Sequence, residues 1–163
     1  CLLKHGAKKV FAVDVGESQL TEELKLNEKV VVKDNLNARN LTVDDLGEYV
    51  DGVVCDVSFI SLTYVLQPIY SILKENGFAV VLLKPQFECG KKYLNKNGIV
   101  NSVKAKEEAA IKIYDFANSI GFAVSDFTNA PLKDGKNVEY LFYLTKSGEK
   151  IISAETVKKR VII

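Results

Sequence analysis

The sequence is short of residues on which several classes of protein depend. It has no methionine, one histidine (His5) and three cysteines (Cys1, Cys55 and Cys89) in 163 residues. A single histidine leaves histidine-based metal sites and Ser-His-Asp triads little to build on. Three widely spaced cysteines without a CxxC pair argue against a disulfide framework or a zinc site, and they fit a reducing cytoplasm.

Charge and hydrophobicity exclude further classes. The net charge is +1, so no overall field attracts nucleic acid or membrane, and any such partner must meet a local patch. No apolar run is long enough to span a bilayer, and no signal peptide opens the chain. A composition of 47% hydrophobic and 26% charged residues is typical of a soluble globular protein, and the length predicts one domain.

Apolar runs alternate with helical segments along the chain. Strands are predicted within residues 8–16, 28–35, 51–59 and 78–83, and helices within 18–26, 42–50, 61–77 and 102–121. Residues 122–130 and 138–145 are predicted to pair as antiparallel strands around the turn signal Asp134-Gly135, and 153–163 form a last helix or an exit segment. Thr42 and Asp45 suit a capping box, and Pro68 predicts a kink or a second helix start.

This order of elements predicts an α/β fold. Strands that alternate with helices favour a mostly parallel sheet with helices on both faces, here ending in an antiparallel hairpin. In such sheets ligands bind outside the carboxyl ends of the strands. Three of the four leading strands end on a charged residue, Asp14, Asp56 or Lys84, and we expect these charges to share one edge.

Each of these charged residues has a functional and a structural interpretation. Asp14 suits the acidic residue that accepts hydrogen bonds from a ribose diol, but it also fits a solvated strand-end carboxylate. Asp56 and Lys84 can form an ion pair that orients the amine as a base, or a plain structural salt bridge. Glu139, early in an apolar strand, either caps the hairpin or completes a charge cluster with Lys84.

Two further features of the sequence concern the surface and the thiols. The loop Cys89–Gly98 is basic and contains Tyr93, so it either meets phosphate and stacks on a base or is a solvated lysine loop. Cys55 and Cys89 lie close to the charged positions, and we expect them to be buried structural thiols rather than nucleophiles.

Taken together, ordered segments of the chain resemble a known family. They are CLLKHGAKKVFAVDVGESQL, NLNARNL, CDVSFISL, LLKPQFECG and KNVEYLFYL. They closely resemble the TlyA family, often labelled hemolysin A, within the FtsJ-like RNA methyltransferases. The resemblance implies a Rossmann-like S-adenosylmethionine-dependent methyltransferase fold. It also implies a cytoplasmic enzyme that methylates the ribose 2′-hydroxyl of cytidines in ribosomal RNA, with ribosomal subunits as partners.

The resemblance also implies roles for particular residues. From the Lys-Asp-Lys-Glu tetrad of FtsJ-like enzymes, Asp56, Lys84 and Glu139 would be catalytic, with Lys84 helping to take the proton of the 2′-hydroxyl. Asp14 would hold the cofactor ribose, Asp34 or Asn37 would lie near the adenine, and Asp56 would also border the cofactor. No metal ion is implied.

The family pattern continues upstream of Cys1. Its glycine-rich cofactor loop, the first and central strand of its sheet, the first lysine of the tetrad and a small RNA-binding domain would all precede that residue. We therefore expect residues 1–163 to be a partial FtsJ-like methyltransferase domain, preceded by further residues in the natural protein. Alone it should bind cofactor weakly and be inactive, with its sheet incomplete where the strand is missing.

Other functions remain as alternatives to the enzyme. One is a catalytically inactive module that binds the ribosome or RNA. Another is a membrane-active hemolysin, as the family label suggests, although the sequence offers no spanning segment. A nicotinamide-dependent dehydrogenase would also use Asp14, but it gives no reason for Asp56, Lys84 and Glu139.

Overall fold

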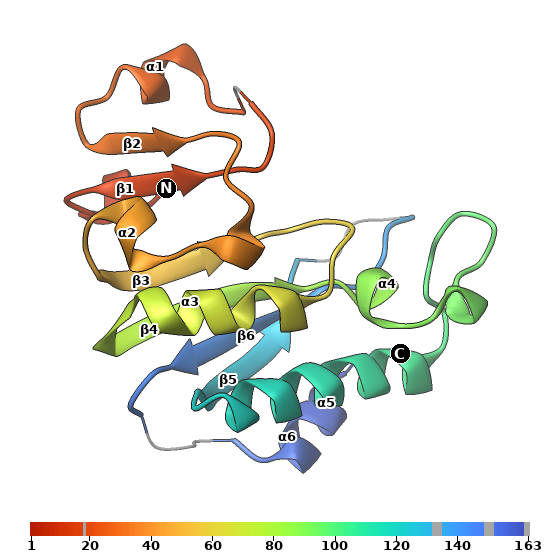
Figure 1. The fold of residues 1–163 in the computed structure, drawn as a ribbon. Helices are drawn as coiled ribbons and strands as arrows, with labels where there is room; N and C mark the ends of the chain where they lie inside the picture. The colour runs from red at the N-terminus through yellow and green to blue at the C-terminus, as the bar shows by residue number, and fades with distance from the viewer. Residues whose placement is uncertain (18, 132–134, 149–151, 162–163) are drawn as a thin grey trace. The chain divides into compact units, whose positions relative to one another are not determined.

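The chain forms two compact units. The structure, a computed structural model, describes residues 1–17, 19–131, 135–148 and 152–161. The first unit is Cys1–Glu48 and the second is Tyr49–Ile163, and each is described by itself (Figure 1). Within the described ranges, no helix has both the length and the hydrophobicity needed to cross a membrane.

The first unit is built on a two-stranded parallel sheet. β1 (Val10–Val13) pairs with β2 (Val30–Lys33) through a connection that contains α1 (Glu22–Lys25). The unit also contains η1 (Leu3–His5), η2 (Ala38–Asn40) and α2 (Val43–Leu46). Both predicted strands are confirmed, but the helix predicted within 18–26 is a single turn.

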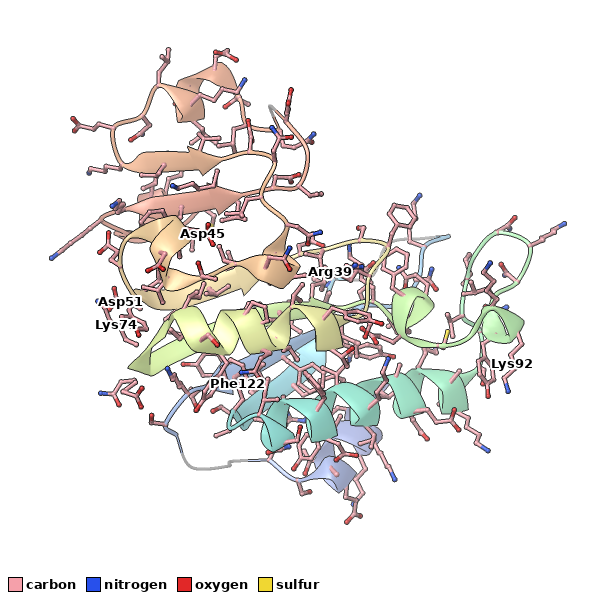
Figure 2. All side chains as sticks on the ribbon, viewed as in Figure 1. Arg39, Asp45, Asp51, Lys74, Lys92 and Phe122 are labelled. Atoms are coloured by element: carbon pink, nitrogen blue, oxygen red, sulfur yellow. The ribbon has the colours of Figure 1, made fainter. Side chains whose placement is uncertain are left out.

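The predicted capping box begins α2. The Thr42 hydroxyl accepts a hydrogen bond from the Asp45 N–H at 3.4 Å, and Asp45 Oδ2 accepts one from the Thr42 N–H at 2.8 Å (Figure 2). Hydrogen bonds from the Thr42 side chain and backbone lower the pKa of Asp45. Gly47 ends the helix with a φ of 78°, a conformation that glycine adopts without steric cost.

The second unit contains a four-stranded mixed sheet in the order β3-β4-β6-β5. Its strands are β3 (Val50–Cys55), β4 (Leu73–Leu83), β5 (Ala123–Asn129) and β6 (Tyr140–Thr145). β3 and β4 are parallel, whereas β6 is antiparallel to both β4 and β5, which confirms the predicted order of parallel strands and hairpin. Of the predicted turn, Gly135 has a φ of 68°, and Asp134 lies outside the described residues.

The remaining elements of this unit connect its strands and follow them. They are η3 (Leu62–Tyr64), α3 (Leu66–Ile72), α4 (Pro85–Glu88), η4 (Lys91–Tyr93), α5 (Val103–Ser119) and α6 (Ala154–Arg160). The predicted second helix start is confirmed, because Pro68 lies in the first turn of α3, where no backbone N–H is needed.

The prediction that this helix runs to Gly77 is wrong. α3 ends at Ile72, and the fully buried Leu73 already pairs with Val50 of β3. The ladder shifts its register before Phe78, so residues 74–77 form an irregular stretch within β4. Burial of Leu73 in the sheet has overridden the helical propensity of this stretch.

The core of the second unit lies on one face of its sheet. Alternate residues of β4 and β6 are fully buried there: Ala79, Val81, Leu83, Tyr140, Phe142 and Leu144. α5 adds buried Ala109 and Ile113, while Phe116 and Ile120, which helical spacing puts on the same side, are half-buried. The opposite face leaves apolar side chains of Val54, Phe78 and Tyr143 partly exposed, unlike the expected sheet covered on both faces.

One close contact pins the register between β3 and β4. Gly52 and Phe78 are partners in the parallel ladder, and the Phe78 ring lies over the glycine. A Cβ atom at Gly52 would lie 2.5 Å from Phe78 Cζ, so a larger residue would displace the ring. The described strands form two separate sheets, one in each unit.

The capping box gives the first testable prediction. Replacing Thr42 by Ala should lower the free energy of unfolding by about 1 kcal/mol, because the backbone N–H at the third helical position loses its acceptor. Urea unfolding followed by circular dichroism measures the change. Thr21→Ala is the matched control, because Thr21 precedes α1 without a side-chain cap hydrogen bond. Equal losses in both variants would contradict a capping role.

Candidate functional site

The candidate site lies at the carboxyl ends of β3 and β4. Parallel pairing, with Cys55 opposite Val81, brings Asp56 and Lys84 to the same edge of the sheet. Lys84 Nζ lies 2.7 Å from Asp56 Oδ1 and donates a hydrogen bond to Ser58 Oγ at 2.8 Å. The predicted ion pair is therefore confirmed.

The two residues of the ion pair, Lys84 and Asp56, differ in solvent exposure. The Lys84 side chain is 13% exposed, whereas the Asp56 side chain is 68% exposed. Pro85 begins α4, and Lys84 keeps extended backbone angles before it, as the Lys-Pro pair predicts. The apolar strand thus delivers a shielded ammonium group, held in one orientation, to an edge where its carboxylate partner faces solvent.

A buried carboxylate holds α4 in place. The side chain of Glu88 is 1% exposed. It accepts hydrogen bonds from Ser61 Oγ at 2.6 Å and the Leu62 N–H at 2.7 Å, and it pairs with Lys112 Nζ of α5 at 2.8 Å. Sequence reasoning missed this role, although Glu88 closes the motif KPQFE and Ser61 lies in DVSFISL. The two motifs are linked by this contact.

Glu139 lies beside this site without a direct ion pair to Lys84 among the described contacts. It directly precedes β6, and its Oε1 accepts a hydrogen bond from Gln86 Nε2 of α4 at 3.2 Å. Its backbone carbonyl accepts from the Ala130 N–H at 2.9 Å, which closes the hairpin. The following residue, Tyr140, is fully buried, and burial raises its pKa to about 12, so Tyr140 stays a neutral phenol near neutral pH.

Phe59 is a feature that sequence reasoning missed. The side chain is exposed to 90%, and its backbone has a φ of 62°, which is unusual for a bulky residue. The ring lies 5.0 Å from that of Phe87, whose centroid is 5.9 Å from Lys84 Nζ. An aromatic face is thus held in solvent next to the lysine. The only sequence signal was a phenylalanine in the loop after a strand that ends on a charge.

The basic loop after α4 exposes its lysines. Lys91, Lys92 and Lys96 are exposed, and Lys92 Nζ lies 4.9 Å from the centroid of the half-buried Tyr93 ring (Figure 2). The described geometry therefore keeps both interpretations of this loop open, since exposed lysines beside an aromatic ring suit either solvent or a phosphate backbone.

The first unit presents its own group of predicted residues. Asp14 and Asp34 directly follow β1 and β2, whose last residues, Val13 and Lys33, are paired, so both acids lie at the carboxyl end of this sheet. Exposed Asp14 accepts a hydrogen bond from the Gly16 N–H at 2.7 Å, and a Cβ at Gly16 would lie 3.2 Å from the same oxygen. Half-buried Asp34 is engaged in an interaction of its own.

The Asn37 side chain has a structural role, which is to cap η2. Its Oδ1 accepts a hydrogen bond from the Arg39 N–H at 3.1 Å and so caps η2. The contacts within the first unit therefore hold Asp14 as an exposed carboxylate fixed by a backbone N–H, whereas the amide oxygen of Asn37 is occupied.

The thiols near the site, Cys55 and Cys89, are half-buried rather than fully buried as predicted. Burial, followed by the nearby Asp56 charge, raises the pKa of Cys55 to about 11. Burial also raises the pKa of Cys89. The thiolate is the nucleophilic form, so neither environment activates a cysteine at neutral pH.

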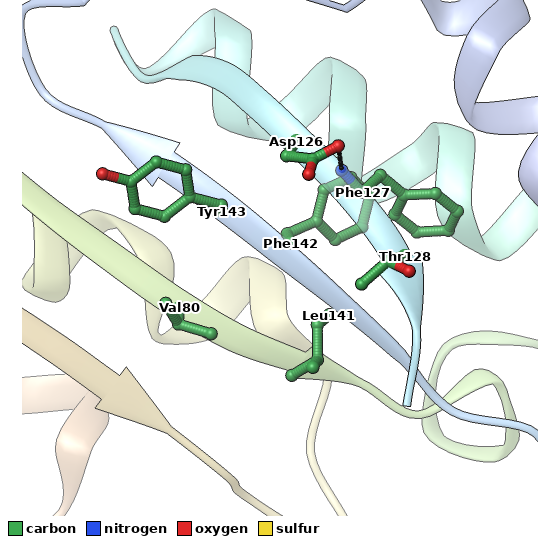
Figure 3. Close-up of a pocket in the computed structure, with 7 residues that line it drawn as sticks. All are labelled: Val80, Asp126, Phe127, Thr128, Leu141, Phe142 and Tyr143. Carbon is green, nitrogen blue, oxygen red and sulfur yellow. Dashed lines mark hydrogen bonds between the residues drawn. The ribbon is translucent and has the colours of Figure 1, made fainter. Parts of the chain in front are cut away.

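A shallow cavity of about 210 Å³ opens on the partly exposed face of the second sheet (Figure 3). Its lining residues come from β4, β5 and β6 and are Val80, Asp126, Phe127, Thr128, Leu141, Phe142 and Tyr143. None of the predicted site residues lines it, and its walls are mostly apolar.

Comparison with known proteins identifies the family. The model of the FtsJ-like methyltransferase family matches residues 1–146, and the chain belongs to that family. Hemolysin A of Brachyspira hyodysenteriae is 38% identical over 143 residues, which cover 86% of this chain and 60% of that protein. The 16S/23S rRNA (cytidine-2′-O)-methyltransferase TlyA of Mycobacterium tuberculosis is 35% identical over 161 residues, which cover 98% of this chain and 60% of that protein.

Solved structures agree with this assignment. A candidate hemolysin from Streptococcus thermophilus superposes with a TM-score of 0.90 at 34% identity, covering 98% of this chain and 59% of that one. More distant structures at 15% and 16% identity, described as methyltransferases, share the Rossmann-like fold alone. The predicted fold class is confirmed. The chain spans about three-fifths of the length of the curated relatives named here.

The buried Glu88 gives a prediction about stability. Glu88→Ala should lower the free energy of unfolding by roughly 2–4 kcal/mol, because the Leu62 N–H and Ser61 hydroxyl lose a charged acceptor. Thermal and urea unfolding measure the loss. Glu108→Ala is the matched control on α5, since its 3.9 Å pair with Lys104 is exposed, and it should cost less than about 1 kcal/mol. Similar losses would contradict the anchoring role.

The thiols give a prediction about pH. With iodoacetamide at pH 8, exposed Cys1 should be alkylated while Cys55 stays unmodified, because the raised pKa keeps the Cys55 thiol protonated. Reaction at Cys55 should rise only as the pH approaches about 11. Peptide mass spectrometry measures both sites, with urea-unfolded protein as the control in which both react. Equal modification of Cys1 and Cys55 in folded protein at pH 8 would contradict the prediction that the raised pKa protects Cys55.

Proposed function

We propose that this chain is the catalytic part of a cytoplasmic enzyme that transfers a methyl group from S-adenosylmethionine to the ribose 2′-hydroxyl of a cytidine in ribosomal RNA. The single observation that carries the proposal is the shielded Lys84 ammonium, fixed by Asp56 and Ser58 at the carboxyl ends of parallel strands. The similarity to TlyA of Mycobacterium tuberculosis supplies the substrate class.

Lys84 and Asp56 account for the movement of the proton. A 2′-hydroxyl becomes a good nucleophile when a base takes its proton during the attack. Lys84 Nζ is the candidate base in its neutral amine form, after the ammonium has released one proton to solvent. Once protonated, Lys84 is an ammonium, and Asp56 Oδ1 at 2.7 Å stabilises the new charge. Ser58 accepts a further hydrogen bond from Nζ at 2.8 Å and limits the directions in which the amine points. Glu139 adds a second negative charge at this end of the sheet.

The cofactor site is proposed for the residues that follow the parallel strands. Asp14 fits a ribose diol because its carboxylate is exposed, while the Gly16 N–H fixes one oxygen at 2.7 Å. Within the first unit, Asp34 and Asn37 follow β2 as candidates for contact with the adenine. In the second unit, Asp56 is a candidate for contact with the cofactor from its place in the family motif alone. When bound, S-adenosylmethionine supplies a methyl group already activated on a sulfonium, so the protein contributes mainly positioning and proton transfer.

The surface around Lys84 suits a single-stranded nucleotide. Phe59 presents an aromatic face at 90% exposure, braced by Phe87 at 5.0 Å, and unstacked bases bind such faces in RNA recognition. Exposed lysines of the basic loop, among them Lys91 and Lys92, would meet phosphate groups. These features support RNA as the substrate, since a small-molecule methyltransferase needs neither.

The test compares two ion pairs at opposite ends of the same strands. In the complete gene product that contains residues 1–163, Lys84→Ala should lower kcat by about 100-fold or more, because the base is lost. Lys74→Ala is the matched control: Lys74 pairs with Asp51 at the same 2.7 Å, but at the amino ends of β3 and β4 (Figure 2). It should keep kcat within about twofold, since it removes only an exposed pair.

The assay follows transfer of label from S-adenosylmethionine to unmodified ribosomal subunits, with the product identified as 2′-O-methylcytidine. Cofactor binding, measured by calorimetry, should survive in the Lys84→Ala variant. A folded, cofactor-binding wild-type protein that labels neither subunit would overturn the proposal and favour an RNA-binding module. Full activity in Lys84→Ala would remove the lysine from the mechanism.

A further inference from the structure

The contact between Glu139 and α4 determines how the carboxylate is held. The β4–β6 ladder ends at the pair Leu83 and Tyr140, so the next residues in register are Lys84 and Glu139. Directly opposed residues of antiparallel strands have Cβ atoms about 4.5–5.5 Å apart. Both residues, however, lie just outside the ladder, where backbone pairing no longer fixes a side chain. Among described side chains, the carboxylate is bonded by Gln86 alone, at 3.2 Å.

Gln86 is itself held by a firmly anchored turn. α4 begins with buried Pro85 and ends with Glu88, whose carboxylate is bonded to Ser61, Leu62 and Lys112. The Cys89 N–H donates to the Pro85 carbonyl at 2.9 Å and closes the turn. The backbone on both sides of Gln86 is therefore fixed, and its side chain starts from a defined position between Lys84 and Glu88.

The orientation of the Gln86 amide follows from chemistry. Only the NH₂ group can donate to a carboxylate, so Nε2 faces Glu139 and Oε1 faces the other way. Oε1 is buried there and accepts no hydrogen bond from any residue that the structure describes. A buried acceptor without a donor lowers stability, and a leucine of similar size would avoid that cost. Gln86 thus lowers the stability of the fold through its unpaired Oε1, while its Nε2 donates a hydrogen bond to Glu139. Residues at functional sites often lower stability in this way.

We infer that Gln86 is a positioning residue that holds the Glu139 carboxylate at the edge where Lys84 acts, an inference that rests on the proposed function. The amide binds one carboxylate oxygen, so the negative charge of Glu139 stays beside the ammonium formed on Lys84. Without this hydrogen bond the Glu139 side chain rotates toward solvent, and the ammonium depends on Asp56 alone. Gln86 itself touches neither the methyl group nor the attacking oxygen.

Replacing Gln86 by Leu tests the inference in the complete gene product. We expect kcat to fall by about 10- to 100-fold, as for a misplaced catalytic group, with KM for RNA and for cofactor within about twofold. The midpoint of thermal unfolding should stay the same or rise, because the unpaired acceptor is gone. Gln67→Leu, on the exposed side of α3, is the matched control and should leave kcat unchanged.

A double-mutant cycle separates positioning from a general structural effect. If Gln86 acts through Glu139, Gln86→Leu should cause no further loss of kcat in a Glu139→Gln background. Losses that multiply, or a fall in kcat that tracks a fall in thermal stability, would overturn the inference. Wild-type kcat in Gln86→Leu would overturn it while leaving the proposed function intact, whereas a wild-type protein that transfers no methyl group would overturn both.

Discussion

The buried carboxylate of Glu88 is the contact on which the candidate site depends. It lies four residues after Lys84 and binds the start of η3, which follows the loop that carries Asp56 and Ser58. Lys112 Nζ of α5 pairs with Oε2, the oxygen that also accepts from Ser61. The buried Glu88 carboxylate therefore connects α5 both to the segment that follows Lys84 and to the segment that follows Asp56. The low local dielectric makes its charged hydrogen bonds strong, and it makes the loss of any partner costly.

The sequence was informative wherever a local pattern decides the structure. Six apolar residues followed by Lys84-Pro85 predict a buried strand that delivers a charge to its end, and the structure confirms this. Asp56 ends the preceding strand, so parallel pairing alone brings the two charges together. The same logic predicts Asp14 at the carboxyl end of its strand, and the structure has it directly after β1. The roles of Asp14 and Asp34 toward a cofactor, and the single partial domain over residues 1–163, stay predictions.

The rest depended on contacts between distant segments. Glu88 meets residues 26 and 27 positions away, and Gln86 reaches Glu139 across 53 positions, so no local pattern distinguishes these polar residues from exposed ones. The positive φ of Phe59 is set by how its loop closes, and a phenylalanine gives no sign of it. The sequence predicts a helix over residues 61–77 that includes Leu73, whereas the burial of Leu73 against β3 ends the helix at Ile72.

The contact between Gly52 and Phe78 determines the face of the sheet on which Lys84 lies. Side chains alternate between the two faces of a strand, so a slip of one residue in β4 would carry Leu83 to the outer position and turn Lys84 toward the core. The ring of Phe78 fits over a glycine and over no larger residue, and this fit defines one alignment of the two strands. The orientation of Lys84 at one end of the sheet thus depends on Gly52, a residue without a side chain near the other end. Gly52 itself takes no part in proton transfer.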